Sequence, residues 1–173
     1  MSVNEMEPYL TLRGHTGPIL SIGTMEGGSS EAGNSVDSMI FSSGVNGDIH
    51  LWRVPHRREV EPYGAVINNQ CQLAMWEQAH ENQPIWALRL NSAGNLLSVG
   101  SDASVALWQA PNSNDLQVKS QSALNDPTEF LLGRFRKTGN LGHFLTPTSA
   151  TWLPGNDKFA ISYRENIFSI YDV

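Results

Sequence analysis

Three side chains in the middle of the chain have the types that nucleophilic catalysis uses. His80, Ser98 and Asp102 match a serine hydrolase, in which an imidazole takes the proton of the serine and a carboxylate orients the imidazole. The residues around Ser98 do not form the Gly-X-Ser-X-Gly turn that presents many such serines, and no oxyanion loop is evident. We therefore expect no catalytic residue, and a hydrolase using these three side chains is kept as the alternative.

The remaining reactive side chains do not indicate a metal or cofactor site. The histidines lack carboxylate or thiolate partners at short intervals, which a metal site requires. Gly27 and Gly28 are not followed by the Gly-Lys-Ser/Thr of a phosphate-binding loop. Cys71 is the only cysteine, so no internal disulfide forms. The five histidines are His15, His50, His56, His80 and His143.

Composition narrows the function further. The chain has 173 residues, 40% of them hydrophobic and 16% charged, which is typical of one globular domain. A net charge of -6 and a pI near 5.3 argue against nucleic-acid binding, which needs clustered Lys and Arg. No apolar run approaches the roughly 20 residues of a membrane-spanning helix, and residues 1–8 lack a secretory signal pattern. We expect a cytoplasmic protein with no integral membrane segment.

One spaced pattern occurs twice and organises the elements that carry these side chains. A histidine is followed by an apolar strand with a serine, then by an acidic or amide turn, then by a strand ending in tryptophan. Recurrence of this kind predicts a repeat architecture. The pattern comprises His15, Ser42, Asn46 and Trp52 in the first unit, and His80, Ser98, Asp102 and Trp108 in the second.

The intervening segments predict strands rather than helices. Asn46-Gly47 is a hairpin signal, and no sustained helical spacing of apolar residues is present. Leu73–Trp76 and Phe130–Leu132 could each add an outer strand. The predicted fold is all-β, with units at about 9–54, 71–110 and 144–173 and loops at 27–38, 55–70 and 111–143.

The two units resemble WD-repeat β-propeller blades. The resemblance rests on Gly14-His15 with Trp52, Ala79-His80 with Trp108, and Tyr171-Asp172 in a weaker third unit. It implies a partial propeller of about three four-stranded antiparallel blades, part of a larger, seven-bladed ring. Propellers need 4 to 8 blades to close. Three units leave the ring open, so we expect that the remaining blades of the propeller are missing from this sequence.

The resemblance also gives the candidate triad a structural role. In WD-type blades the histidine bridges the turn aspartate and the strand serine, and the indole N–H completes the chain of hydrogen bonds. The eight pattern residues are therefore predicted to form structural networks. In the first unit Asn46 would accept from the imidazole without a charge. In the third unit Ile161 and Glu165 take the serine and aspartate positions, so no network is expected.

Further segments are similar to striatin-type propellers. Striatins are scaffolds that gather a type-2A protein phosphatase and Ste20-like kinases, and the resemblance implies protein binding of this kind. Another WD-repeat adaptor, in ubiquitin ligation or membrane traffic, is the alternative. The segments are Glu7–Leu10, Arg13–His15, Gly17–Leu20, Val60–Tyr63, Ala79-His80 with Ile85-Trp86, and Thr146–Ser149.

The same resemblance indicates the contact surface. It places Leu20 and Trp86 at the start of inner strands beside the channel mouth, with Pro18, Pro84, Val45 and Ser101 close by. Trp86 is the best anchor, because aromatic residues with a polar edge are frequent interface hot spots; alternatively it packs between blades. Two basic clusters are candidates for acidic or phosphorylated peptides, or are simply solvated. They are Arg53 with His56–Arg58, and Arg134 with Arg136 and Lys137.

Overall fold

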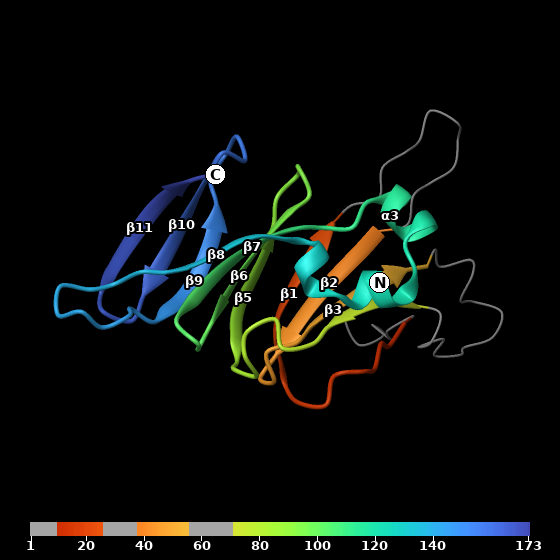
Figure 1. Cartoon of the computed structure of the whole chain (residues 1–173), viewed down its shortest axis with the longest axis horizontal. Coiled ribbons are helices and arrows are strands. Elements are labelled where there is room, and N and C mark those ends of the chain that lie inside the picture. The colour runs from red at the N-terminus through yellow and green to blue at the C-terminus, as the bar shows by residue number, and fades with distance from the viewer. Residues whose placement is uncertain (1–9, 26–37, 56–70) are drawn as a thin grey trace, which may run out of the picture.

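The computed structural model describes residues 10–25, 38–55 and 71–173, and within them the chain forms three antiparallel sheets that lie side by side (Figure 1). The first sheet contains β1 (Ile19–Met25), β2 (Ser38–Gly44), β3 (Ile49–Val54) and β4 (Gln72–Trp76). The second contains β5 (Ile85–Leu90), β6 (Asn95–Gly100), β7 (Ser104–Gln109) and β8 (Leu131–Arg136). The third contains β9 (Pro147–Trp152), β10 (Lys158–Tyr163) and β11 (Ile167–Asp172).

Each sheet is a meander in which strands adjacent in sequence pair with one another. The turns between the second and third strands of each sheet contain residues with positive φ, namely Gly47 (78°), Ala103 (64°) and Asn166 (60°). Glycine and asparagine tolerate this conformation, whereas Ala103 adopts it against the preference of its Cβ. The predicted all-β class and partial propeller are confirmed.

The sheets pack through their inner strands, so that β5 lies between β1 and β9. The backbone N–H of Leu88 in β5 donates to Ser21 Oγ of β1 at 2.9 Å. On the other side, Trp152 Nε1 of β9 donates to the Arg89 carbonyl oxygen of β5 at 2.8 Å. These two bonds tie neighbouring sheets through their inner strands.

Strands β6 and β7 of the middle sheet are buried on both faces, whereas β8 is mostly exposed. Successive side chains of a strand point to opposite faces, so neighbouring residues of β6 enter different cores. Leu96 of β6 packs in a core with the first sheet, and Leu97 packs in a core with the third. The first core includes Phe41, Ile49, Leu51, Trp76, Leu88, Leu96, Trp108 and Phe130. The second includes Ala87, Leu97, Val99, Val105, Ala150, Phe159, Ile161 and Tyr163.

The structure corrects two features of the predicted organisation. Strand β4 pairs with β3 of the first sheet, so the predicted unit 71–110 is divided between two sheets. The third sheet has three described strands rather than four. Strand β4 contains the predicted outer strand Leu73–Trp76, whose sheet could not be assigned from an apolar run of four residues. The predicted loops 27–38 and 55–70 lie almost entirely outside the described residues.

The predicted loop 111–143 is also wrong in part, since it contains α3 (Ser113–Val118), α4 (Gln121–Asn125), a 3-10 turn (Pro127–Glu129) and β8. Local caps form these helices: the Asn112 side chain accepts from the Asp115 backbone N–H, and Asp115 accepts from the Asn112 N–H. Only Leu124 of the two helices is buried. With so little apolar surface, neither helix produces the periodicity that sequence analysis detects.

No helix in the described part of the chain is both long and apolar enough to cross a bilayer.

Trp76 closes the core between the first two sheets. Its ring stacks on Trp108 and on Phe130, with ring centroids 5.3 Å apart in each case, and its Nε1 donates to the Leu124 carbonyl at 3.0 Å. Strand β4, the second sheet and the helical segment therefore meet at one side chain.

We predict that Trp76→Ala lowers the free energy of unfolding by about 3–5 kcal/mol, because it leaves a large cavity in this core. Urea denaturation followed by circular dichroism measures the change. The control is Val118→Ala at an exposed position of α3, which should change stability by less than about 0.5 kcal/mol. Equal effects of the two substitutions would contradict the assigned core.

Candidate functional site: buried histidine networks

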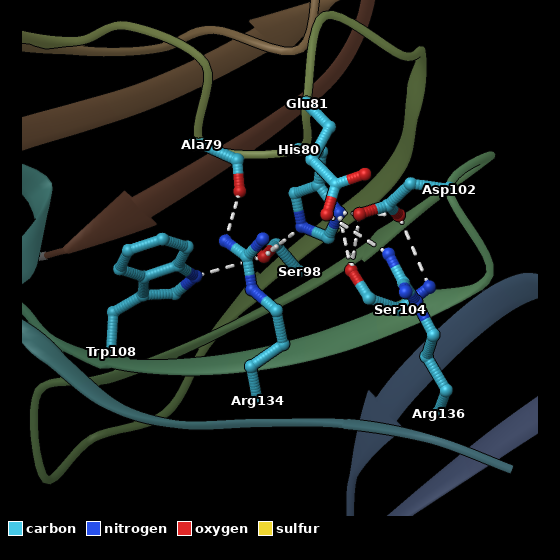
Figure 2. A network of polar contacts seen from close by, with 9 residues as sticks. All are labelled: Ala79, His80, Glu81, Ser98, Asp102, Ser104, Trp108, Arg134 and Arg136. Carbon is cyan, nitrogen blue, oxygen red and sulfur yellow. Dashed lines mark hydrogen bonds and ion pairs between the residues drawn. The ribbon is translucent and has the colours of Figure 1, made fainter.

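The structure brings His80, Ser98, Asp102 and Trp108 into one polar network in the second sheet (Figure 2). His80 lies in the loop that leads into β5, Ser98 in β6, Asp102 in the β6–β7 turn and Trp108 in β7. His80 Nε2 is 2.8 Å from Ser98 Oγ, and His80 Nδ1 is 2.9 Å from Asp102 Oδ1. Trp108 Nε1 donates to Ser98 Oγ at 2.8 Å.

These contacts define which atom donates and which accepts in each hydrogen bond of the network. Since the Trp108 indole can only donate, Ser98 Oγ accepts from it and is free to donate its own proton to His80 Nε2. His80 then carries its proton on Nδ1 and donates it to Asp102. In this arrangement each buried polar atom on the path has a partner.

Ser104 is a further member of the network that sequence analysis did not assign. Its hydroxyl donates to Asp102 Oδ2 at 2.6 Å, its backbone N–H donates to Asp102 Oδ1 at 3.1 Å, and its Oγ lies 3.0 Å from His80 Nδ1. Burial alone would raise the pKa of Asp102, but the bonds from His80 and Ser104 and the attraction of His80 outweigh it. The pKa of Asp102 is therefore well below its ordinary value, and the carboxylate is ionised at neutral pH.

The loop that carries His80 is fixed from several sides. The His80 backbone N–H donates to the Gly47 carbonyl at 3.1 Å, which ties the loop to the turn of the first sheet. A Cβ at Gly100 would lie 2.3 Å from His80 Nδ1, so glycine is required where the imidazole enters. Arg134 of β8 donates to the Ala79 carbonyl and lies over the Trp108 ring, with 5.8 Å between its Cζ and the ring centroid.

The second predicted basic cluster is thus partly engaged in structure. Arg134 covers the loop, and Arg136 forms an ion pair with Glu81 at 3.0 Å (Figure 2). Among the first cluster, His56–Arg58 lie outside the described residues.

The geometry of His80, Ser98 and Asp102 suits a hydrolase, but the surroundings do not. Both His80 and Ser98 are 0% exposed. Ser98 Oγ is occupied on one side by the Trp108 indole and on the other by the imidazole. A substrate carbonyl would have to displace the core to reach it. The arrangement can hold the loop before β5 in place on its sheet. In the described residues no group of three or more metal-ligating side chains lies together.

The first sheet has a related but weaker network. His15 Nε2 is 2.7 Å from Ser42 Oγ, which also accepts from Trp52 Nε1 at 2.7 Å. Asn46 does not contact the imidazole as predicted: its exposed amide donates to Thr16 Oγ1 at 2.6 Å. An uncharged amide attracts the imidazole far less than a carboxylate does, and the nearby hydroxyl takes the bond instead.

His50, which sequence analysis left unassigned, stacks on His15 with ring centroids 3.8 Å apart. It is buried in β3, two residues before Trp52 and therefore on the same face. Burial and the neighbouring His15 lower the pKa of His50 from 6.5 to about 4. Burial likewise lowers the pKa of His15, although Asp48 partly opposes this. The spacing of two residues between His50 and Trp52 was the sequence signal that could have placed His50 beside the network.

In the third sheet a pair of tyrosines replaces the histidine network. Ile161 stands where β6 has Ser98, and Tyr163 stands where β6 has Gly100, as the strand registers show. The Tyr163 and Tyr171 hydroxyls lie 2.6 Å apart. Burial and the bond to Tyr171 raise the pKa of Tyr163. His143 is exposed in the loop before β9, so it is a loop residue and not a third network histidine.

The predicted contact residues occupy equivalent places in the first two sheets. The Pro18 carbonyl accepts from the Val45 N–H at 3.1 Å, and the Pro84 carbonyl accepts from the Ser101 N–H at 2.8 Å. Leu20 and Trp86 are the second residues of β1 and β5, and each lies at a shift in strand register. They are 37% and 40% exposed, respectively. Thr148 has the same place in β9, at a register shift, and was not predicted.

Comparison with known proteins agrees with this architecture. The family model "WD domain, G-beta repeat" matches residues 70–109. Striatin-3 of Mus musculus is 31% identical over 105 residues, which cover 60% of this chain and 12% of that protein. A striatin homolog of Dictyostelium discoideum is 25% identical over 174 residues, covering 98% of this chain and 18% of its own. The WD40 domain of Toxoplasma gondii coronin superposes with a TM-score of 0.61 at 16% identity, covering 93% of this chain and 32% of that chain.

The three packed sheets have the fold of a partial β-propeller, and residues 70–109 match the WD-repeat family model. The sequence is similar to that of striatins. The chain spans less than a fifth of the length of the curated striatins it matches.

We predict that Ser98→Ala lowers the free energy of unfolding by about 1–3 kcal/mol, because Trp108 Nε1 and His80 Nε2 lose a shared partner in a site closed to water. Chemical denaturation measures the loss. Ser162→Ala, in the third sheet, is the control and should cost much less, since among the described residues the Ser162 hydroxyl bonds only to the exposed Thr148 hydroxyl. The wild-type chain should remain unlabelled by a fluorophosphonate probe. Labelling at Ser98, or unchanged stability of Ser98→Ala, contradicts the structural role.

A second prediction concerns pH. Because the folded-state pKa of His50, about 4, lies below its ordinary value of 6.5, the unfolded chain binds this proton more tightly. The stability contribution is complete above about pH 6.5 and is lost as the pH falls toward 4. The melting temperature of His50→Ala should therefore fall less than that of the wild type across this window. Alanine is compatible with position 50, since Ala106 in β7 occupies the position of the second sheet that corresponds to His50. Parallel pH profiles would refute the assignment.

Proposed function

We propose that this chain is a non-enzymatic protein-interaction platform of the striatin type, acting in the cytoplasm. The observation that carries the proposal is the common placement of Leu20, Trp86 and Thr148, here called the rim residues. Each is the second residue of an inner strand and is exposed. The inner strands pack against one another, so the rim residues fall along one edge of the arc.

The backbone at the rim residues favours contact with a partner. A register shift at each of them inserts one extra residue into the strand, as in a β-bulge. Bulges turn a side chain away from the regular pleat and are frequent next to functional sites. Trp86 contributes the largest apolar surface of the three. Pro18, Val45, Pro84 and Ser101 support the rim through the hydrogen bonds that hold the adjoining turns.

Similarity to striatins supports a role in assembling a type-2A phosphatase with Ste20-like kinases. A different WD-repeat adaptor role, in ubiquitin ligation or membrane traffic, would use the same rim with other partners. The closed surroundings of Ser98 disfavour the hydrolase alternative. We further propose that blades supplied from outside this chain complete the propeller.

We predict that Trp86→Ala raises the Kd for a purified type-2A phosphatase complex or a Ste20-like kinase by about tenfold or more, because a central aromatic anchor is lost. Biolayer interferometry with the immobilised chain measures this. Val118→Ala, at an exposed position on α3, is the control and should bind as the wild type does. Unchanged affinity of Trp86→Ala excludes the rim as the contact. Absence of binding by the wild type excludes these partners.

A further inference from the structure

The loop that enters the third sheet does not dock as the equivalent loop of the second sheet does. In the second sheet the incoming loop inserts His80 against the β6–β7 turn. In the third sheet Tyr163 stands where Gly100 admits that imidazole, and its hydroxyl is already bonded to Tyr171. The incoming segment 137–146 inserts no histidine there, and instead buries Leu145 in the second core. A hollow of about 660 Å³ remains between it and the β10–β11 turn.

Segment 137–146 is nevertheless an ordered hairpin. The Leu145 N–H donates to the Lys137 carbonyl at 2.8 Å, and the Gly139 N–H donates to the His143 carbonyl at 2.8 Å. Thr138 and Phe144 form a β-bridge, and Gly142 takes the positive φ of 78° that the turn requires. The hairpin therefore gives the wall of the hollow a defined backbone conformation.

Apolar side chains gather at this hollow without being buried by the described residues. Leu141 is 85% exposed, Phe144 55% and Ile167 43%. The Phe144 ring is held by Arg136, whose Cζ lies 5.6 Å from the ring centroid. These side chains contribute little to the stability of the fold, because water still covers them. Covering them with a partner would remove apolar surface from water and so stabilise a complex.

The charges at the hollow select the partner. Three ionisable side chains line it, Lys137, His143 and Glu165. The Glu165 carboxylate accepts from the Thr146 N–H, at 3.2 and 3.3 Å to its two oxygens. Lys137 has no carboxylate partner among the described residues, and its Nζ lies 6.0 Å from the Tyr171 ring centroid. In a chain with a net charge of -6, this is an unpaired positive charge beside an apolar wall.

We propose that this hollow, bounded by Lys137, Leu141, Phe144 and Ile167, binds a peptide segment in which a bulky apolar residue adjoins an aspartate or glutamate. The apolar side chain enters the hollow, and the carboxylate pairs with Lys137 Nζ. This deepens the proposed platform function by adding a second contact surface, distinct from the rim residues.

The test is selection from a random ten-residue peptide library displayed on phage, with the intact chain as bait. The wild type should enrich peptides that place Leu, Ile, Met or Phe within two positions of Asp or Glu. A synthetic peptide from the enriched set should then bind at least tenfold more weakly to Leu141→Ser and to Lys137→Glu, as measured by fluorescence anisotropy. Both positions allow substitution without loss of core, and equal melting temperatures verify this.

Two controls separate this proposal from the platform function. Val118→Ser removes an equally exposed apolar side chain elsewhere and should leave peptide binding unchanged. Trp86→Ala should also keep it, since the rim residues are a different surface. No enriched motif, a basic motif, or full binding by Leu141→Ser overturns the hollow as a site. Loss of the peptide with Trp86→Ala assigns it to the rim and likewise overturns this proposal, while the platform function stands.

Discussion

The architecture depends on one buried chain of hydrogen bonds, from the Trp108 indole through Ser98 to His80 and Asp102. It joins the loop before β5 to the two middle strands of the same sheet, and the loop in turn is tied to the first sheet through Gly47. A desolvated polar path of this kind is favourable only when every member is paired. It therefore specifies one position for the loop, where apolar packing alone would accept several.

The sequence predicted most of this arrangement because its signals are local and directional. The resemblance of the order histidine, serine, aspartate, tryptophan to WD-type blades indicated the second network, and the Asn-Gly turn indicated a hairpin. What it could not predict depends on neighbours in space. The partner of Asn46 is decided by Thr16, the sheet of β4 by the free edge of β3, and the helices α3 and α4 by caps rather than by an apolar stripe.

The third sheet shows how the same blade geometry is maintained with different chemistry. Its strands keep the register of the second sheet while a phenol pair occupies the space of the imidazole. Apolar stacking around Phe159 and Tyr171, with ring centroids 5.3 Å apart, takes over cohesion there. The incoming hairpin carries no network histidine and packs through Leu145, which is buried in the second core.

Burial of β6 and β7 of the middle sheet on both faces has a consequence for how the chain opens. The first and third sheets each pack against another described sheet on one side only. Their amide protons therefore become exposed to exchange by local unfolding of a single sheet, without unfolding of the whole arc. Amide protons of β6 and β7 should then exchange with solvent most slowly, and those of β11 among the fastest. A gradient of this form lets the ends of the arc adjust to adjoining structure while the centre stays native.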